Sequence, residues 1–285
     1  MSVRAPLLAA LLLGSTLATA PASAAWADPV TPQAMTVPVG AEPDGTPVRL
    51  DVSVWPQSSG RHPVVLLAHG FGGSKDSVTG QANDLHDRGY VVIAWSARGH
   101  GASGGRIHLD DPAYEIADAR ALLDLAAKRG DVELDAPGDP RVGVMGASYG
   151  GALGLMLAGV DRRVDGVVSA ITWNDLADAF FPQAALSRPP TTAAGRAPIG
   201  APGPFKQVWA TNFFLSALRG GQAAGAGAGQ CGRFDPTICK LFVQASETAA
   251  ASPQLTALLR AHSPKPTMNR VTAPTFLVQG IGDSL

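Results

Sequence analysis

The strongest candidate for chemistry in this sequence is a serine between small residues. Ser148 stands in Gly146-Ala147-Ser148-Tyr149-Gly150, between the apolar run Arg141–Met145 and the small-residue stretch Tyr149–Val160. A sharp turn from a buried strand into a helix needs flanking residues almost without side chains, and it lifts the hydroxyl above the sheet. The helix N-terminus then stabilises developing negative charge. The pattern predicts Ser148 as the nucleophile of acyl transfer, with a plain glycine-rich turn as the alternative.

A second glycine-rich segment supplies the donors that such a reaction needs. His69-Gly70-Phe71-Gly72-Gly73 directly follows the apolar run Pro63–Ala68. Acyl transfer requires two donors aimed at the oxyanion, one from the residue after the nucleophile and one from a loop of this kind. The backbone N–H groups of Tyr149 and Phe71 are therefore the predicted oxyanion donors. The alternative is an ordinary glycine turn in which His69 is structural.

The predicted acid is an aspartate near the end of the chain. Asp283 closes Gln279-Gly280-Ile281-Gly282-Asp283 after the apolar run that begins at Thr275. A carboxylate at the end of a late strand keeps the chain order nucleophile, acid, histidine. A surface aspartate in a terminal turn is the alternative reading of Asp283. Asp175, which follows the preceding strand, is a rival acid.

The base is not evident from the sequence. Only Ser284 and Leu285 follow Asp283, and all six histidines come earlier. His69 belongs to the oxyanion segment, and His100 lies in a glycine-rich turn where a structural role is expected. His262 is the substitute candidate for the base. The expectation is that the chain is cut short at its C-terminus, before its triad histidine.

Strands and helices alternate along the chain. One strand shows apolar alternation and is expected at a sheet edge, and the others are continuous apolar runs typical of parallel strands buried on both faces. The expected strands are Val48–Trp55, Pro63–Ala68, Tyr90–Trp95, Arg141–Met145, Val164–Ile171 and Thr275–Gln279, and the expected helices are Asp76–Arg88, one starting at Asp111-Pro112, and Tyr149–Val160. This order predicts an α/β fold with a mostly parallel sheet covered on both faces. An insertion at about residues 173–270, between two strands, predicts a helical cap.

The N-terminal segment resembles an export signal. Arg4 precedes an apolar run from Pro6 to Ala20, and Ala22-Ser23-Ala24 offers a cleavage site. Residues 1–24 are therefore predicted to be a signal peptide, with an uncleaved anchor as the alternative, and residues 25–47 an extended lead-in. The mature protein is expected to be secreted and to have no membrane span.

The two cysteines and the overall charge indicate which bonds and partners to expect. Cys231 and Cys239 are the only cysteines, and an exported protein with two close cysteines is expected to pair them, with two unpaired thiols as the alternative. A metal site is disfavoured because no histidine lies close to them in sequence. A formal net charge of -1 without any basic run argues against nucleic acid as a partner. We expect no metal and no organic cofactor.

These segments together resemble a known family. The Ser148–Tyr149 elbow, the Arg98–Gly105 turn, Ser169–Asp175 and Gln279–Leu285 look like secreted actinobacterial members of the Xaa-Pro dipeptidyl-peptidase and cocaine-esterase family. The resemblance implies an α/β-hydrolase fold, a Ser/Asp/His triad, a helical cap after the sixth strand and often a C-terminal β-sandwich. The chain departs from that pattern in having no triad histidine and no β-sandwich, and in using His-Gly-Phe-Gly-Gly where the esterase branch uses a tyrosine side chain.

The expected function follows from the nucleophile and the resemblance. We expect a secreted serine hydrolase that acts through an acyl-enzyme, with Xaa-Pro dipeptidyl-peptidase-like activity on a small peptide as the first hypothesis. Carboxylic-ester hydrolysis is the close alternative, because cap residues choose the substrate and this cap has no readable code. A catalytically inactive hydrolase fold used for binding is the alternative of another class.

Overall fold

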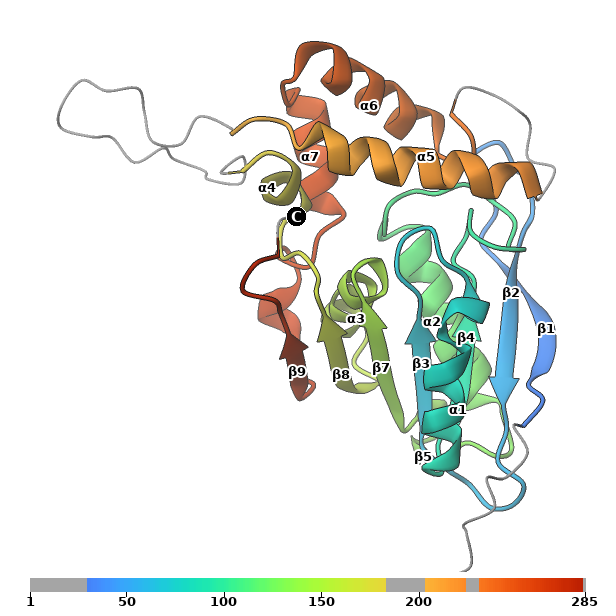
Figure 1. Ribbon diagram of the computed structural model, residues 1–285. Helices are drawn as coiled ribbons and strands as arrows, with labels where there is room; N and C mark the ends of the chain where they lie inside the picture. Colours follow the sequence, from blue (N-terminus) through green and yellow to red (C-terminus); the bar gives the residue numbers. More distant parts are fainter. Residues whose placement is uncertain (1–29, 183–202, 224–230, 284–285) are drawn as a thin grey trace, which may run out of the picture.

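A computed structural model describes residues 30–182, 203–223 and 231–283. Seven strands form one sheet in the order β1-β2-β4-β3-β7-β8-β9, shown in Figure 1. The pairs from β4 to β9 are parallel, whereas β1 and β2 pair antiparallel with each other and β2 with β4. The strands are β1 (Gln33–Val39), β2 (Val48–Trp55), β3 (Val64–Ala68), β4 (Val91–Trp95), β7 (Val142–Ala147), β8 (Val164–Ala170) and β9 (Thr275–Val278), and a separate pair joins β5 (Leu134–Ala136) to β6 (Asp139–Pro140). The expected α/β-hydrolase architecture is confirmed.

Helices cover both faces of the sheet. Successive residues of β3 show this, because Leu66 belongs to a core shared with α2 and α3, whereas Leu67 packs with the residues of α1. A fully buried parallel strand presents apolar side chains to both sides, which explains the continuous apolar runs. The helices of this part are η1 (Lys75–Val78), α1 (Thr79–Asp87), α2 (Glu115–Ala127) and α3 (Tyr149–Val160).

Three expectations about the sheet need correction. The strand Val48–Trp55 is not at the edge, because Gln33–Val39 of the supposed loose lead-in pairs with it along its length. Val37 is buried under that pairing, so the lead-in contributes to the core. The run at Thr275–Val278 is a strand but is not buried, and Phe276 is 65% exposed. It is the outer strand beyond β8, and no other described element packs on it as α3 packs on β8.

Among the described residues, four α-helices lie between β8 and β9, in the part expected to form a cap. They are α4 (Leu176–Phe180), α5 (Gln207–Ala223), α6 (Pro236–Thr248) and α7 (Pro253–Ala261), and η2 (Met268–Arg270) leads back to the sheet. Figure 1 shows α5 to α7 gathered over the end of the sheet at which the parallel strands finish. The predicted signal peptide and parts of the predicted cap, residues 183–202 and 224–230, lie outside the described residues.

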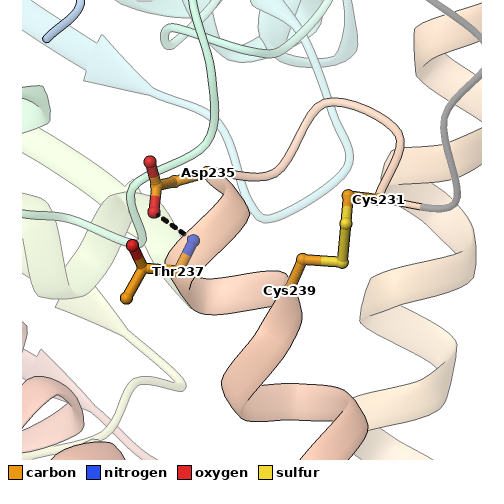
Figure 2. The surroundings of a disulfide bond; sticks show 4 residues. All are labelled: Cys231, Asp235, Thr237 and Cys239. Atoms are coloured by element: carbon orange, nitrogen blue, oxygen red, sulfur yellow. Dashed lines mark hydrogen bonds between the residues drawn. A yellow bond between two sulfur atoms is a disulfide. The ribbon is translucent and has the colours of Figure 1, made fainter.

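A disulfide joins Cys231 to Cys239 at the start of α6, as predicted (Figure 2). Asp235 caps this helix, because its carboxylate accepts a hydrogen bond from the Thr237 N–H at 2.8 Å. The same segment forms a short parallel bridge with the main domain, in which Ile107 N–H donates to Arg233 O at 2.7 Å. The disulfide therefore closes a loop that contacts the body of the protein directly.

Candidate active site

The turn at Ser148 has the strained geometry that the sequence pattern predicts. Ser148 has φ +52° and ψ −118°, a left-handed φ that is uncommon for a residue with a side chain. A Cβ added at Gly146 would lie 2.5 Å from the carbonyl carbon of Gly150, and one added at Gly150 would lie 2.6 Å from Ala68 O. The turn thus packs against itself and against the end of β3 so closely that these two positions must be glycine.

The end of β8 holds this turn in place. Ser148 N–H donates to Ala170 O at 2.8 Å, and the Thr172 hydroxyl donates to Ser148 O at 2.7 Å. Three residues further along the chain, in α3, Gly151 O accepts a hydrogen bond from the Ser169 hydroxyl at 3.1 Å. Sequence analysis missed Thr172 as a supporting residue, since a threonine after a strand carries no signal of its own. Strain of this kind persists only where neighbours over-determine it, and these bonds do so.

The predicted oxyanion segment lies beside the serine. A Cβ added at Gly70 would be 3.9 Å from Ser148 Cβ and 3.6 Å from Ala147 O. The Phe71 ring meets the Tyr149 ring edge-on, with the centroids 5.5 Å apart. Among the described residues, no protein acceptor takes up the Phe71 N–H. Tyr149 is the first residue of α3, where a backbone N–H has no intrahelical partner. Both predicted donors are thus next to Ser148 and available.

A cavity of about 80 Å³ lies between this segment and the cap. It borders Phe71 and Tyr149 on the side of the main domain, and Ser148 itself does not line it. The cap contributes mainly aromatic and aliphatic side chains, among them Trp173, Phe180, Phe181, Phe205, Phe213, Phe214, Phe234, Phe242 and Leu258. No carboxylate or amine of the described residues lines it. The site next to the serine is therefore suited to an apolar group.

The two acid candidates have different surroundings. Asp283 is exposed in the turn after β9, and Gln279 Nε2 donates to its carboxylate at 2.8 Å. Gln279 also accepts from Thr172 N–H at 3.1 Å, so the Asp283 turn is tied to the end of β8 that supports Ser148. The carboxylate of Asp175, the rival acid, caps α4 and lies 3.3 Å from Lys265 Nζ. Its oxygens are thus occupied by structural contacts.

None of the six histidines shares a hydrogen bond with Ser148 within the described part of the chain. His62, His69, His86, His100, His108 and His262 each bond to other groups. His262, the substitute base, lies at the end of α7, where its Nε2 is 3.0 Å from the Asp111 carboxylate and its Nδ1 is buried without a partner. The structure therefore brings the nucleophile and the oxyanion donors together, but not a base.

Two histidines form part of the wall behind the oxyanion segment. His69 accepts a hydrogen bond from Ala97 N–H at 2.9 Å, and its other ring nitrogen is 2.7 Å from Gly70 O. Burial lowers the pKa of His69, and burial together with His69 lowers the pKa of His100 to about 3. Both rings are therefore neutral at physiological pH and behave as aromatic packing groups beside Phe71.

Two features are absent from the described part of the chain. No group of three or more histidine, cysteine or acidic side chains could hold a metal ion there. No helix there is long and apolar enough to cross a membrane.

Comparison with known proteins identifies the family. Residues 44–285 match the family model described as X-Pro dipeptidyl-peptidase (S15 family). The chain belongs to this family. The match covers every strand of the sheet except β1, together with the elbow and the helices described before β9, so it includes each site residue discussed above.

Characterised relatives of this S15 family member are hydrolases. A monoacylglycerol lipase from Mycolicibacterium smegmatis is 36% identical over 107 residues, which are 37% of this chain and 36% of the relative. A 2,6-dihydropseudooxynicotine hydrolase from Paenarthrobacter nicotinovorans is 28% identical over 137 residues, which are 47% of this chain and 34% of the relative. The matched part spans about two fifths of the length of the first curated relatives.

Solved structures agree on the fold. The structure of DcsB in complex with its substrate analogue superposes with a TM-score of 0.53 at 20% identity, over 88% of this chain and 82% of that one. The 2,6-dihydroxy-pseudo-oxynicotine hydrolase gives 0.52 at 18% identity, over 87% and 53%. At these identities the likeness shows the α/β-hydrolase fold and nothing finer.

Proposed function

We propose that this protein is a serine hydrolase that cleaves carboxylic esters with a compact apolar group, through an acyl-enzyme on Ser148. The observation that carries the proposal is the position of Ser148 in a strained turn beside two free backbone donors and an aromatic cavity. The family membership and the hydrolases among its relatives support the same reaction class.

The reaction balances as a two-step acyl transfer. Ser148 Oγ bonds to the substrate carbonyl carbon and gives its proton to a base, and the carbonyl oxygen becomes an oxyanion held by the Phe71 and Tyr149 N–H groups. The bond to the leaving alcohol breaks, and the alcohol takes the proton from the base. Water then repeats the sequence on the acyl-Ser148 ester and releases the acid. Asp283 is our proposed acid partner of the base. His262 is the described histidine to be tested as an alternative base, and its own carboxylate partner is Asp111.

The cavity favours esters over Xaa-Pro dipeptides. A dipeptidyl-peptidase must hold the free ammonium of its substrate, and a buried ammonium needs a paired carboxylate. The described residues that line the cavity include no carboxylate, and the polar groups among them are the Tyr149 hydroxyl and the Trp173 indole. Xaa-Pro peptidase activity remains the second candidate, because the family model bears that description and a proline ring would suit an aromatic cavity.

The deciding experiment compares two substrates on two variants of the full-length protein. We expect turnover of p-nitrophenyl butyrate and labelling by a fluorophosphonate probe, both abolished in Ser148→Ala. Ser59→Ala, which changes an exposed serine, is the control and should behave as wild type. Turnover of Ala-Pro-p-nitroanilide in preference to the ester would favour the peptidase. Labelling that persists in Ser148→Ala would refute the nucleophile assignment.

We further propose that the protein is exported, with residues 1–24 removed as a signal peptide. The disulfide supports an oxidising compartment. N-terminal sequencing of secreted protein should start near Ala25, and a mature protein that retains its first residues would contradict cleavage.

A further inference from the structure

Two consecutive residues with left-handed backbone lie on the main-domain side of the cavity. Leu109 has φ +60° and Asp110 has φ +57°, and neither is glycine. Such a backbone conformation is strained for a residue with a side chain, and strained residues cluster at functional sites. Leu109 lines the aromatic cavity, and Asp110 is the next residue in the chain and is fully buried. The strain is therefore located next to the proposed site.

The Asp110 side chain is also poorly satisfied. It is fully buried, and neither carboxyl oxygen has a hydrogen-bond partner within the described structure. Burial raises the pKa of Asp110 well above its usual range, and the nearby Glu115 carboxyl raises it further. A carboxyl group in this position is retained at a cost to stability, and a structural turn alone would not require it.

Asp110 lies against Tyr149. Its backbone N–H donates to the Tyr149 hydroxyl at 3.2 Å, and Tyr149 is itself only 1% exposed. The same hydroxyl partly offsets the effect of burial on the pKa of the Asp110 carboxyl, so the side chain of Asp110 adjoins it as well. The Tyr149 ring is in contact with the rings of Phe71 and His100, each 5.5 Å away between centroids. A contact that holds the Tyr149 hydroxyl therefore helps to fix the positions of both proposed oxyanion donors. The Tyr149 N–H belongs to the same residue, and the Phe71 N–H belongs to a residue whose ring packs on the Tyr149 ring.

We propose that Asp110 is a positioning residue for the oxyanion site, which fixes the Tyr149 ring and thereby the Tyr149 and Phe71 N–H groups beside Ser148. The inference rests on the proposed hydrolase function. A positioning role for Asp110 predicts a loss of turnover when the side chain is removed, because a displacement of about 1 Å at an oxyanion donor can lower turnover on the order of 100-fold. A packing role would lower stability and leave kcat unchanged.

The test measures kcat and KM separately for ester hydrolysis by the full-length protein. Asp110→Ala and Tyr149→Phe should each lower kcat by about 10- to 100-fold with little change in KM. The double variant should be no worse than the poorer single one, because the two groups act through one contact. The raised pKa keeps the Asp110 side chain uncharged. Asp110→Asn replaces it with a neutral side chain of the same shape, so the kcat of this variant should stay within about 3-fold of the wild-type value.

The control separates this role from simple destabilisation. Leu122→Ala removes a fully buried side chain of α2 and should lower the melting temperature without lowering kcat. Asp110→Ala with wild-type kcat, or Leu122→Ala with an equal loss of kcat, would overturn the inference. Ser148→Ala identifies the other failure: if it retains activity, the proposed function is wrong and the inference falls with it.

Discussion

Arg98 is the clearest place to test what holds the main domain together. Its guanidinium is 1% exposed and donates to both Asp118 oxygens at 2.7 and 2.6 Å, and to Glu42 at 3.2 Å. It also lies 4.9 Å from the centre of the Tyr114 ring. The contacts join the loop before β2, the turn after β4 and helix α2. That turn carries His100, which packs against Phe71, so the Arg98 contacts also support the proposed oxyanion segment.

Replacing Arg98 with methionine should be costly because it leaves two buried carboxyls without their cation. Removal of one partner from a buried ion pair typically costs about 3–5 kcal/mol, a large share of the 5–15 kcal/mol that stabilises a typical domain. Arg106 is the matched control. It pairs with Asp44 at 2.7 Å, but its side chain is 38% exposed and its partner 45%. Water screens an exposed pair and leaves it little net effect on stability, so Arg106→Met should be nearly neutral.

The assay is urea unfolding of both variants, followed by circular dichroism at pH 5 and pH 8. Burial raises the pKa of Asp118, and Arg98 counteracts this, so the Arg98→Met variant should raise that pKa further above its usual 3.8. A raised folded-state pKa stabilises the folded protein at low pH and loses that contribution as pH rises. The loss in Arg98→Met should therefore be greater at pH 8 than at pH 5. Equal losses for the two arginine variants, or a larger loss at pH 5, would refute the reasoning.

Two further predictions concern the disulfide and the pH dependence of stability. Because Cys231 and Cys239 are 8 residues apart, the double variant Cys231→Ser/Cys239→Ser should lose about 2.5 kcal/mol of unfolding free energy, measured by urea unfolding, and an unchanged midpoint would contradict this. Burial raises the pKa of Glu115 to about 8. The free energy of unfolding should therefore fall as pH rises from 4.5 to 8, by up to about 1.4 kcal/mol per pH unit from this group, and Glu115→Gln should remove this part of the pH dependence. Burial lowers the pKa of His100 to about 3, so its contribution opposes that of Glu115 below pH 6.5, and a loss of stability with falling pH should be seen most clearly in the Glu115→Gln variant.

The central part of the fold could be predicted from local sequence because its signals are local. Continuous apolar runs such as Val64–Ala68 indicate buried parallel strands. The glycines at 146 and 150 indicate a turn so closely packed that it has no room for side chains at these two positions. The sequence does not show what covers a strand, so the apolar run Thr275–Val278 was expected to be buried and is exposed. The same limit hid β1, whose burial depends on pairing with β2 and not on its own short pattern.

The site was predictable only where chemistry imposes a pattern. Ser148, Phe71 and Tyr149 could be proposed from the sequence because an elbow and a glycine-rich loop have characteristic neighbours. Thr172 was not, because its hydroxyl matters only when folding brings it to the Ser148 carbonyl. Asp110 was not, since its importance lies in a backbone conformation and a lack of partners that no residue type reveals. Supporting residues of this kind depend on tertiary contacts and need the structure.

The disulfide segment shows why the cap and the oxyanion loop form one unit. Arg233 is buried and donates to Gly101 O at 2.8 Å and also to Ser103 O, so it fastens the cap to the turn that carries His100. Phe234 stacks between Phe71, 5.9 Å away, and Phe214 of α5, 5.0 Å away. A side chain fixed by such packing moves only if its neighbours move, since interiors are close-packed. The cap therefore does more than line the cavity: it supports one of the two donors that the proposed reaction requires.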